Sequence, residues 1–265
     1  MSITGDNVLE IVDLCVRVGI KEVLSHINMA IPEGEVHVLL GPNGSGKTSL
    51  LMTIMGFPEY VVTCGSLWFK GQDITETPVH ERVRMGLAIA QQRPPTVRGI
   101  TLRALLEYIL QNETDSTGRL EELAKASHME TLLDRDVNYG LSGGEIKRSE
   151  LIQLFALSPE FSLMDEPDSG VDVEALTLMG EIINRHFMTD PVRPVLRKAG
   201  LIITHNGNIL RQLPIDKAHV MVNGQIGCSG NPNILMQHIN SFGYESCIRC
   251  MTERKSCSGL VSLER

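Results

Sequence analysis

Residues 41–48 read GPNGSGKT and combine the residue types that hold a chain of phosphates. Three glycines let the backbone curl so that successive amide N–H groups converge on phosphate oxygens. The side chain of Lys47 can reach the β- and γ-phosphates, and the hydroxyl of Thr48 can bind Mg²⁺. We therefore expect a nucleoside triphosphate to contact the following residues: Gly41, Pro42, Asn43, Gly44, Ser45, Gly46, Lys47, Thr48 and Ser49.

The segments on either side of this glycine-rich turn supply the setting that such a loop requires. An apolar run at residues 36–40 has the length of one buried strand, and residues 49–55 have the length of a helix that stops at Gly56. The helix adds the positive end of its dipole to the phosphate site. The alternative is a glycine-rich turn that precedes a helix by chance, but all four constrained positions of the loop are filled.

An acidic pair, Asp165 and Glu166, follows an apolar strand predicted at residues 161–164. A carboxylate in this position can hold Mg²⁺ directly or through water, which makes Asp165 the expected metal partner of Thr48. Glu166 can polarise the attacking water as a general base. The alternative role for such a pair is a helix N-terminal cap.

Two further polar residues stand where predicted strands end. Gln92 follows the strand predicted at residues 87–90, and we expect its amide to serve catalysis and the metal site by contacting the γ-phosphate and the attacking water. Gln91 is the rival for this role. His205 ends the strand predicted at residues 201–203. A ring nitrogen of His205 can bond the γ-phosphate, and the alternative is a structural histidine.

A second helix start with anion-binding features occurs at Ser142-Gly143-Gly144. A serine hydroxyl and glycine amides at the start of a helix can bind phosphate. One phosphate chain already has its loop at residues 41–48, so the second helix start is best explained as serving the nucleotide of another subunit. We therefore predict a head-to-tail homodimer that buries two ATP molecules between its subunits.

Strands that alternate with helices, with key polar residues at the C-terminal ends of strands, predict an α/β fold with a mostly parallel sheet. Residues 9–16 and 23–31 predict antiparallel strands ahead of that sheet. Leucines at helical spacing predict a helical subdomain inserted at about residues 93–142. We expect residues 201–203 to form the last buried strand.

Size and composition narrow the class of protein. The 265 residues carry a net charge of −8, which argues against a nucleic-acid partner. No apolar stretch approaches the roughly 18 residues that span a bilayer, and the first six residues lack the pattern of a signal peptide. We therefore expect a cytoplasmic protein that does not insert into a membrane. Six cysteines in such a chain predict reduced thiols and no disulfide framework.

The stretches above, in this order, resemble those of ABC-type ATPases over about residues 8–237. The matching stretches are GPNGSGKT, the glutamine at position 92, LSGGE from Leu141, LMDEP from Leu163 and ITH ending at His205. The resemblance implies a RecA-like P-loop core with an N-terminal antiparallel β subdomain and the inserted helical subdomain. It places these in a domain of residues 1–246, followed by a tail of residues 247–265. It also implies Mg²⁺-dependent ATP hydrolysis, with residues 169–172 communicating across the dimer.

Within this family the chain is more similar to the ATPases of the SUF iron–sulfur cluster assembly system (SufC) and their minimal archaeal-type relatives. The likeness rests on an insertion-like segment at residues 59–66 and on three stretches: GEVHVLLGPNGSGKT from Gly34, LSGGEIKRSELIQL from Leu141 and DEPDSGVDVEAL from Asp165. It implies a SufB/SufD-like scaffold that docks on the helical subdomain and is reshaped by ATP-driven dimerisation. The alternatives are the nucleotide-binding subunit of a membrane ABC transporter and an interaction module that binds ATP with negligible turnover.

Two features depart from the family pattern. Many transporter ATPases stack adenine on an aromatic residue, and residues 8–31 contain none, so we expect the phosphates to supply most of the binding. The tail carries Cys247-x-x-Cys250, with Cys257 beyond it. One such pair offers two ligands where a zinc ion or an iron–sulfur cluster takes four. Free thiols and a transient iron or cluster contact with the partner both stay open.

Overall fold

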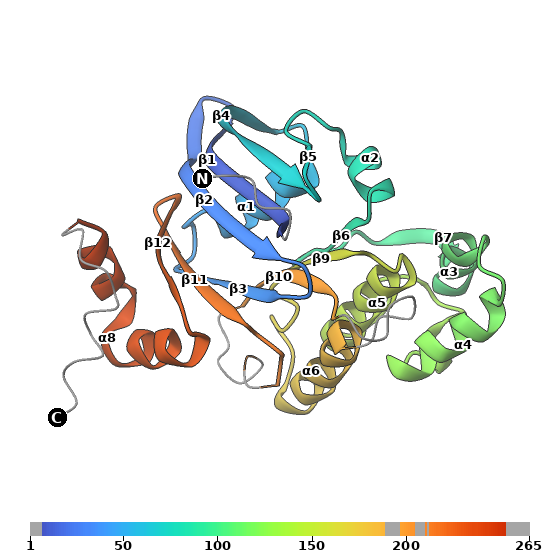
Figure 1. Cartoon of the computed structure of the whole chain (residues 1–265). Helices are drawn as coiled ribbons and strands as arrows, with labels where there is room; N and C mark the ends of the chain where they lie inside the picture. The colour runs from blue at the N-terminus through green and yellow to red at the C-terminus, as the bar shows by residue number, and fades with distance from the viewer. Residues whose placement is uncertain (1–6, 189–196, 205–209, 211, 253–265) are drawn as a thin grey trace.

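A six-stranded sheet in the order β12-β11-β3-β10-β9-β6 forms the centre of the protein (Figure 1). All neighbouring strands pair in parallel except the β11–β12 hairpin, which confirms the predicted α/β fold. The computed structural model describes residues 7–188, 197–204, 210 and 212–252. The strands are β3 (Val36–Leu40), β6 (Leu87–Ala90), β9 (Phe161–Asp165), β10 (Ala199–Ile203), β11 (Lys217–Val222) and β12 (Gln225–Gly230).

A second sheet, in the order β2-β1-β4-β5, stands against the central one (Figure 1). Its pairings are all antiparallel, as the sequence predicted. Most of the insertion-like segment at residues 59–66 forms the first half of β4, which pairs with β1. The strands are β1 (Asn7–Val18), β2 (Lys21–Pro32), β4 (Tyr60–Phe69) and β5 (Gln72–Asp73).

Helix α1 (Lys47–Met55) connects the two sheets through a shared core. Its side chains Leu50, Leu51 and Ile54 are fully buried and belong to one hydrophobic cluster with residues of both sheets. Burying each such side chain contributes about 1.5–3 kcal/mol. Gly56, at φ 80°, ends the helix in the left-handed conformation that glycine adopts at no steric cost. This packing holds the residues before α1 at one edge of the central sheet.

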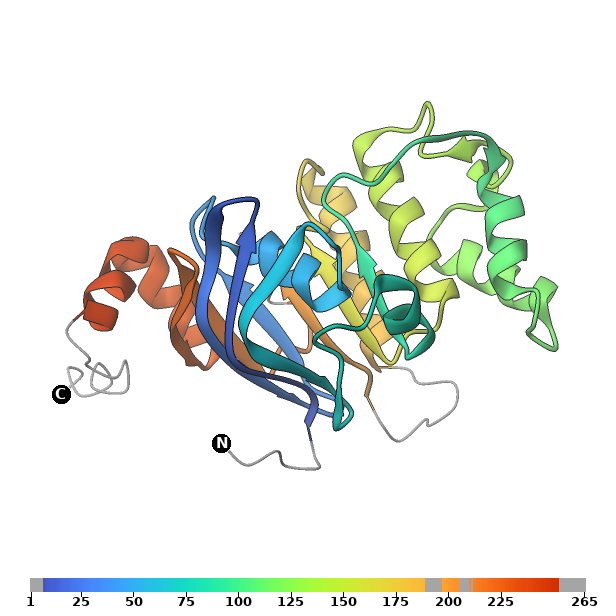
Figure 2. The same ribbon diagram turned by 90° about the horizontal axis from the view of Figure 1, so that it is seen from above.

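The expected helical subdomain projects from one end of the central sheet, opposite the C-terminal helix (Figure 2). Its helices are accompanied by a small sheet of two strands, which the leucine pattern did not predict. The two helices of residues 143–156 and 173–188 pack against the central sheet in one hydrophobic cluster, and a short helix follows β5. The elements are α2 (Val79–Arg84), β7 (Val97–Thr101), α3 (Leu102–Leu110), α4 (Ser116–Ala126), η1 (Glu130–Leu132), β8 (Asp136–Val137), α5 (Gly143–Ala156) and α6 (Val173–Met188).

The prediction that residues 201–203 form the last buried strand is wrong. Strand β11 follows β10, lies beside β3 and is buried over five of its six residues. An Asn223-Gly224 turn with positive φ at both residues connects β11 to β12. Asn-Gly between two apolar runs is a strong hairpin signal, so the sequence did contain the information for this hairpin.

The C-terminal helix α8 runs from Pro232 to Thr252, with a kink at Gly243. It therefore continues through position 247, where the tail was expected to begin. The backbone of Cys247 and Cys250 belongs to this helix, but their side chains, like the whole of Cys257, lie outside the described part of the chain. The expected iron or cluster contact is not tested by this structure.

The expectation that no cysteines are paired is wrong, because Cys15 and Cys64 form a disulfide. Cys15 lies on β1 and Cys64 on the neighbouring strand β4, so their α-carbons are 4.9 Å apart. This separation is within the range that a disulfide can bridge. The pair was not predictable from spacing, since 49 residues separate the two cysteines. Among the described residues, Cys228 is buried and takes part in no disulfide.

Candidate active site

A cavity of about 770 Å³ opens at the carboxyl ends of four parallel strands. Its volume falls in the range of sites for small organic ligands. The glycine-rich loop after β3 and the start of α1 form its floor, and residues 21–25 of β2 form a wall. The remaining lining residues follow the ends of three other strands: Gln92 after β6, Glu166 after β9, and Asn223 with Gly224 after β11.

The loop at residues 41–46 has the geometry that phosphate binding needs. No side chain caps the first turn of α1, and Gly46 precedes the helix at φ 106°, a conformation strained for any other residue. A β-carbon on Gly41 would lie 2.2 Å from the Met221 carbonyl oxygen, so only glycine fits there. An uncapped helix start presents its amide N–H groups and positive dipole end to an anion.

The Lys47 ammonium group lies inside this loop. Its Nζ donates hydrogen bonds to the carbonyl oxygens of Gly41 (2.9 Å) and Pro42 (3.0 Å). Burial lowers the pKa of Lys47, and the negative charges of Glu166 and Asp165 act in the opposite direction. These carbonyl oxygens hold the positive charge of Lys47 inside the loop, where it is within reach of phosphates that bind there.

Asp165, at the end of β9, is 1 % exposed, and neither of its carboxylate oxygens has a hydrogen-bond partner of normal geometry among the described residues. Burial raises its pKa, and the nearby Thr48 hydroxyl and the charges of Lys147 and Lys47 lower it. A buried carboxylate whose oxygens make no hydrogen bond of normal geometry with the described residues, and which lies near a threonine hydroxyl, offers the oxygen ligands that Mg²⁺ prefers. The roles of Asp165 and Thr48 in holding Mg²⁺ stay a prediction, for which these two residues lie in suitable positions.

Glu166 and Gln92 meet across the cavity, where the Gln92 side-chain amide donates a hydrogen bond to the Glu166 carboxylate. The backbone of Glu166 has φ 48°, which is rare for a residue with a side chain. Such strained residues cluster at functional sites. The backbone amide of the rival Gln91 instead donates to Glu150 (3.0 Å), and Gln91 does not line the cavity. Glu166 and Gln92 therefore both line the cavity and bond each other, and their catalytic roles stay a prediction.

Lys147 is a member of the site that the sequence analysis missed. It lies on the second turn of α5 and is 6 % exposed. Its Nζ donates to the backbone carbonyls of Gln92 (2.8 Å) and Glu166 (3.1 Å), and burial lowers its pKa. It therefore ties together the two segments that carry the proposed catalytic side chains. No signal in the sequence marked it, because its partners are backbone carbonyls and its burial is known only from the structure.

The Ser142-Gly143-Gly144 turn is not part of this cavity. Ser142 and Gly143 are exposed, and none of the three residues lines the space above the P-loop. Ser142 caps α5 through a capping box with Glu145, as its amide and hydroxyl bond the Glu145 carboxylate and amide. Gly143 lies against the carbonyl of Gly170, within the loop predicted to communicate across the dimer. The turn is thus a preformed, capped helix start that lies outside its own subunit's cavity.

The remaining predicted residue, His205, lies outside the described residues. The residue before it, Thr204, is buried, and its hydroxyl donates to the Asp168 carboxylate (2.8 Å). This bond fixes the end of β10, from which the chain enters His205. The cavity wall at residues 21–25 contains no aromatic ring, consistent with weak contacts to a base.

Comparison with known proteins agrees with this geometry. Residues 24–169 match the model of the family described as ABC transporter. A probable ABC transporter ATP-binding protein of Streptococcus pyogenes serotype M18 is 37% identical over 235 residues, which cover 85% of this chain and 89% of that protein. Vegetative protein 296 of Bacillus subtilis is 35% identical, covering 89% of this chain and 92% of that protein.

Among solved structures, a nucleotide-free ATP-binding cassette from an ABC transporter superimposes with a TM-score of 0.70. Its sequence is 25% identical, and the match covers 89% of this chain and 95% of that chain. A search of the described residues for a helix of sufficient length and apolarity to cross a membrane found none.

Proposed function

The chain belongs to the ABC transporter family and is an ATP hydrolase, and from this premise we propose that two copies join head to tail around two ATP molecules. In this proposal the P-loop, Asp165, Glu166 and Gln92 of one copy act on the phosphates. The Ser142 turn of the other copy closes the same site. The proposal is carried by one observation: that turn is an exposed, capped helix start outside its own subunit's cavity.

The residues of the cavity divide the work as follows. The loop amides and Lys47 hold the β- and γ-phosphates. Thr48 and Asp165 would hold Mg²⁺, which would neutralise charge on the phosphate oxygens when bound. Glu166 accepts a proton from the attacking water as that water approaches the γ-phosphate. The Gln92 amide turns from Glu166 to the water and phosphate when nucleotide enters. A second subunit excludes bulk water and adds the positive helix end of Ser142-Gly143-Gly144.

The dimer is tested with Glu166→Gln, which keeps the shape of the side chain and removes the base. We expect turnover to fall by about 10²-fold or more, as for loss of a general base. The variant should accumulate as a dimer in MgATP and remain a monomer in MgADP, as measured by size-exclusion chromatography with light scattering. A variant that stays monomeric in MgATP at every protein concentration would contradict the shared site.

Two helix-capping residues, Ser142 and Thr101, allow an effect on catalysis to be distinguished from an effect on stability. Ser142→Ala removes the cap of α5, and Thr101→Ala removes the cap of α3, where the Thr101 hydroxyl accepts from Ala104 N (3.1 Å). Each change should cost about 1 kcal/mol of unfolding free energy. Only Ser142→Ala should also lower ATP turnover at saturating MgATP, by about tenfold or more. Equal turnover in the two variants would show that Ser142 is a cap and nothing else.

The partner we propose first is a membrane-spanning component of a transporter. Support comes from the relatives, since the similar Streptococcus pyogenes protein is itself called a probable ABC transporter ATP-binding protein. The helical subdomain around α3 and α4 projects away from the central sheet and offers a surface for such a component (Figure 2). In this arrangement the subunit works on the cytoplasmic side, as the sequence led us to expect.

The second candidate partner is a SufB/SufD-like scaffold for iron–sulfur clusters. It is favoured by the stretches LSGGEIKRSELIQL from Leu141 and DEPDSGVDVEAL from Asp165, which resemble the SUF ATPases. The catalytic site would be the same for both partners. The two differ in what the ATPase moves: a membrane channel in one case, a cluster scaffold in the other.

Affinity purification of the tagged Glu166→Gln chain with MgATP, from detergent-treated membranes and separately from the supernatant, distinguishes the two. A polytopic membrane protein that is enriched from the membranes supports the transporter. A scaffold enriched from the supernatant, with iron and sulfide in stoichiometric amounts, supports cluster assembly. In the second case, Cys247→Ser with Cys250→Ser tests whether the tail contacts the metal, because unchanged iron loading would exclude that contact.

A further inference from the structure

Three neighbouring strands of the antiparallel sheet become irregular at the same place. Besides a shift near its start, the pairing of β1 with β2 shifts register at three successive points between Ile11 and Arg17, and the pairing of β1 with β4 shifts on both sides of Cys15. Asp13 and His26 have φ 49° and 52°, values that residues with side chains rarely adopt. Bulges of this kind re-aim side chains and are common beside functional sites.

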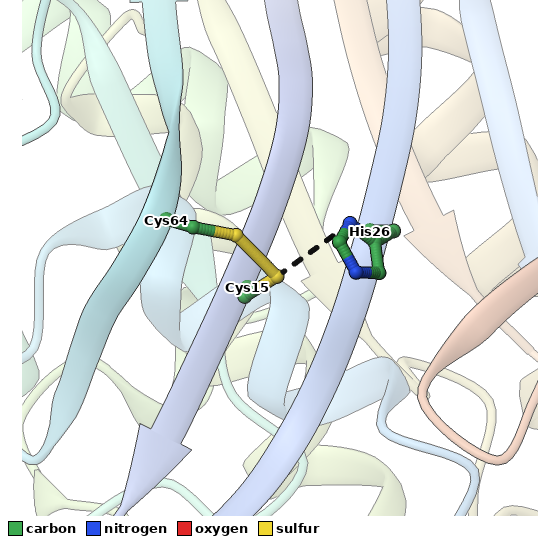
Figure 3. A group of neighbouring side chains, drawn as sticks. All are labelled: Cys15, His26 and Cys64. Atoms are coloured by element: carbon green, nitrogen blue, oxygen red, sulfur yellow. Dashed lines mark hydrogen bonds between the residues drawn. A yellow bond between two sulfur atoms is a disulfide. The ribbon is translucent and has the colours of Figure 1, made fainter.

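The irregular strands bring three potential metal ligands together, and the Asp13 carboxylate lies beside one of them. Cys15 on β1, Cys64 on β4 and His26 on β2 project from the same part of the sheet (Figure 3), and one ligand atom from each lies within 4.8 Å of the others. His26 Nδ1 is 3.9 Å from Cys15 Sγ and 2.8 Å from the Asp13 carboxylate. Cys64 Sγ lies 3.2 Å from the Asp13 backbone oxygen.

A disulfide accounts for the two sulfur atoms and for nothing else in this cluster. It does not require an imidazole nitrogen or a carboxylate beside it, and it does not require left-handed backbone at Asp13 and His26. Two sulfurs, one imidazole and one carboxylate are the ligand types that Zn²⁺ takes in four-coordinate protein sites. The nitrogen-to-sulfur distance of 3.9 Å is close to the roughly 3.6 Å that neighbouring N and S ligands of a tetrahedral zinc ion have.

We propose that Cys15, Cys64, His26 and Asp13 form a zinc site when the Cys15–Cys64 disulfide is reduced. Two thiol molecules each supply one electron and one proton to the S–S bond, which gives two protein thiols and one small-molecule disulfide. Zn²⁺ then displaces the two thiol protons, which pass to solvent. The two sulfurs move apart to about 3.8 Å, the separation of neighbouring thiolates on tetrahedral zinc. The oxidised state shown in Figure 3 and the metal-bound state exclude each other.

The position of the site allows an ion to enter it. The side chains of His26 and Asp13 are 65 % and 60 % exposed, while Cys15 is buried and anchors the site to the sheet. His26 follows Ser25, which belongs to the wall of the nucleotide cavity. The site therefore lies on the strand that borders bound nucleotide but shares no residue with the catalytic set, and it does not depend on the function proposed above.

The test uses the full chain with Cys247, Cys250 and Cys257 changed to Ser, so that tail thiols do not compete. The protein is reduced with a thiol that is then removed under argon, and titrated with Zn²⁺ and with Co²⁺ without nucleotide. We expect one Zn²⁺ per chain, and with Co²⁺ a thiolate charge-transfer band and the intense visible bands of tetrahedral coordination. The same protein oxidised back to the disulfide should bind neither ion at this site.

Variants define the ligands. Cys15→Ser and Cys64→Ser should each abolish the charge-transfer band in part or whole, and His26→Ala should weaken zinc binding by about tenfold or more. His80→Ala, which removes an exposed histidine elsewhere, should have no effect. His26 is exposed, so its variant folds even where a change at buried Cys15 does not. A reduced chain that binds no zinc, or one whose zinc binding His26→Ala leaves unchanged, would overturn the proposal.

Discussion

At the scale of single residues, the active edge depends on how the Glu166 backbone is held. Its φ of 48° costs about 1–2 kcal/mol relative to an ordinary conformation. Three hydrogen bonds keep it there. The Glu166 amide donates to the Ile203 carbonyl (3.0 Å), and the Glu166 carbonyl accepts from Lys147 Nζ (3.1 Å) and from the Ser169 amide (3.1 Å). Lys147 also bonds the Gln92 backbone carbonyl. One buried ammonium group therefore sets the spacing between Glu166, the proposed base, and Gln92, which is proposed to contact the attacking water.

We therefore expect Lys147→Met to lower kcat for ATP by about tenfold to a hundredfold, since a small misplacement of a catalytic group has that effect. The KM for ATP should change little, because Lys47 and the loop amides still hold the phosphates. Steady-state kinetics of this variant beside Lys125→Met, which removes an exposed lysine of α4, measures the difference. A change in KM with kcat intact would assign Lys147 to nucleotide binding.

At the scale of elements, the P-loop helix is fastened at its C-terminal end by a buried arginine. Arg82 on α2 is 2 % exposed and donates to the carbonyls of Thr53 and Ile54 in α1 (both 2.8 Å). It also donates to three backbone carbonyls around the start of α2: Ile74, Thr75 and Thr77. Burial lowers its pKa to about 10, so the guanidinium is still charged at neutral pH and complements the negative end of the α1 dipole.

Removing this cation should destabilise the whole ATP-binding half of the chain. Arg82→Met takes the side-chain donor from the carbonyls of Ile54, Thr75 and Thr77, at about 1–3 kcal/mol for each that is left without a partner. The carbonyls of Thr53 and Ile74 keep a backbone amide as donor. We expect the free energy of unfolding in urea to fall by about 3 kcal/mol or more. Arg84→Met, on an exposed position of the same helix, should change it by less than about 0.5 kcal/mol. Equal effects of the two changes would mean that Arg82 does not fasten α1.

At the scale of the whole molecule, the central sheet contains histidines that are buried in the neutral form. His219 on β11 bonds His37 on β3 (3.0 Å) and Ser229 on β12 (2.7 Å), which links three adjacent strands. Burial lowers the pKa of His219 to about 3 and also lowers that of His37. His186, packed behind the sheet against Ser162 (2.8 Å), has a pKa lowered well below its usual value by burial.

These histidines make stability depend on pH. Below about pH 6.5 an unfolded histidine binds a proton and the native one does not, so acid favours unfolding, by up to about 1.4 kcal/mol per pH unit for each histidine. For His219 this continues down to about pH 3, where the native side chain also titrates. Stability contributed by the neutral form is therefore complete above pH 6.5 and is lost as the pH falls.

Asp165 and Glu150 have the opposite effect on the unfolding free energy. Burial raises their pKa values, so the native protein takes up these protons at a higher pH than the unfolded chain, and acid stabilises the native state at these two sites. Both wild type and His219→Gln contain Asp165 and Glu150, so the contribution of these carboxylates cancels when the two proteins are compared. Between pH 6 and pH 5 we expect the unfolding free energy of wild type to fall more steeply than that of the variant, by about 1 kcal/mol over the unit. Urea titrations at each pH supply both slopes. Parallel slopes would show that His219 is protonated in the native state.

Much of this molecule was determined by the sequence alone. The strand, glycine turn and helix around Lys47 were predicted with nearly their observed bounds, because the determinants of a P-loop are local and few residue types satisfy them. The same holds for the acidic pair at the end of β9. The missed hairpin of β11 and β12 was marked by Asn223-Gly224, so its omission was an error of interpretation.

Tertiary structure alone decided which of two adjacent glutamines lines the cavity, and what Lys147 and Arg82 hold. Both cations bond backbone carbonyls, among them Thr53 and Ile54 for Arg82 and Gln92 for Lys147, which are distant in the sequence. A carbonyl is the same group at every position, so no pattern of residues marks these bonds. The meeting of Cys15, Cys64 and His26 likewise depends on bulges in paired strands, whose register is set by neighbours distant in sequence. The local sequence determines the P-loop and the acidic pair, because their residue types are adjacent in the chain. Contacts between residues distant in the sequence are determined only by how the sheets pack.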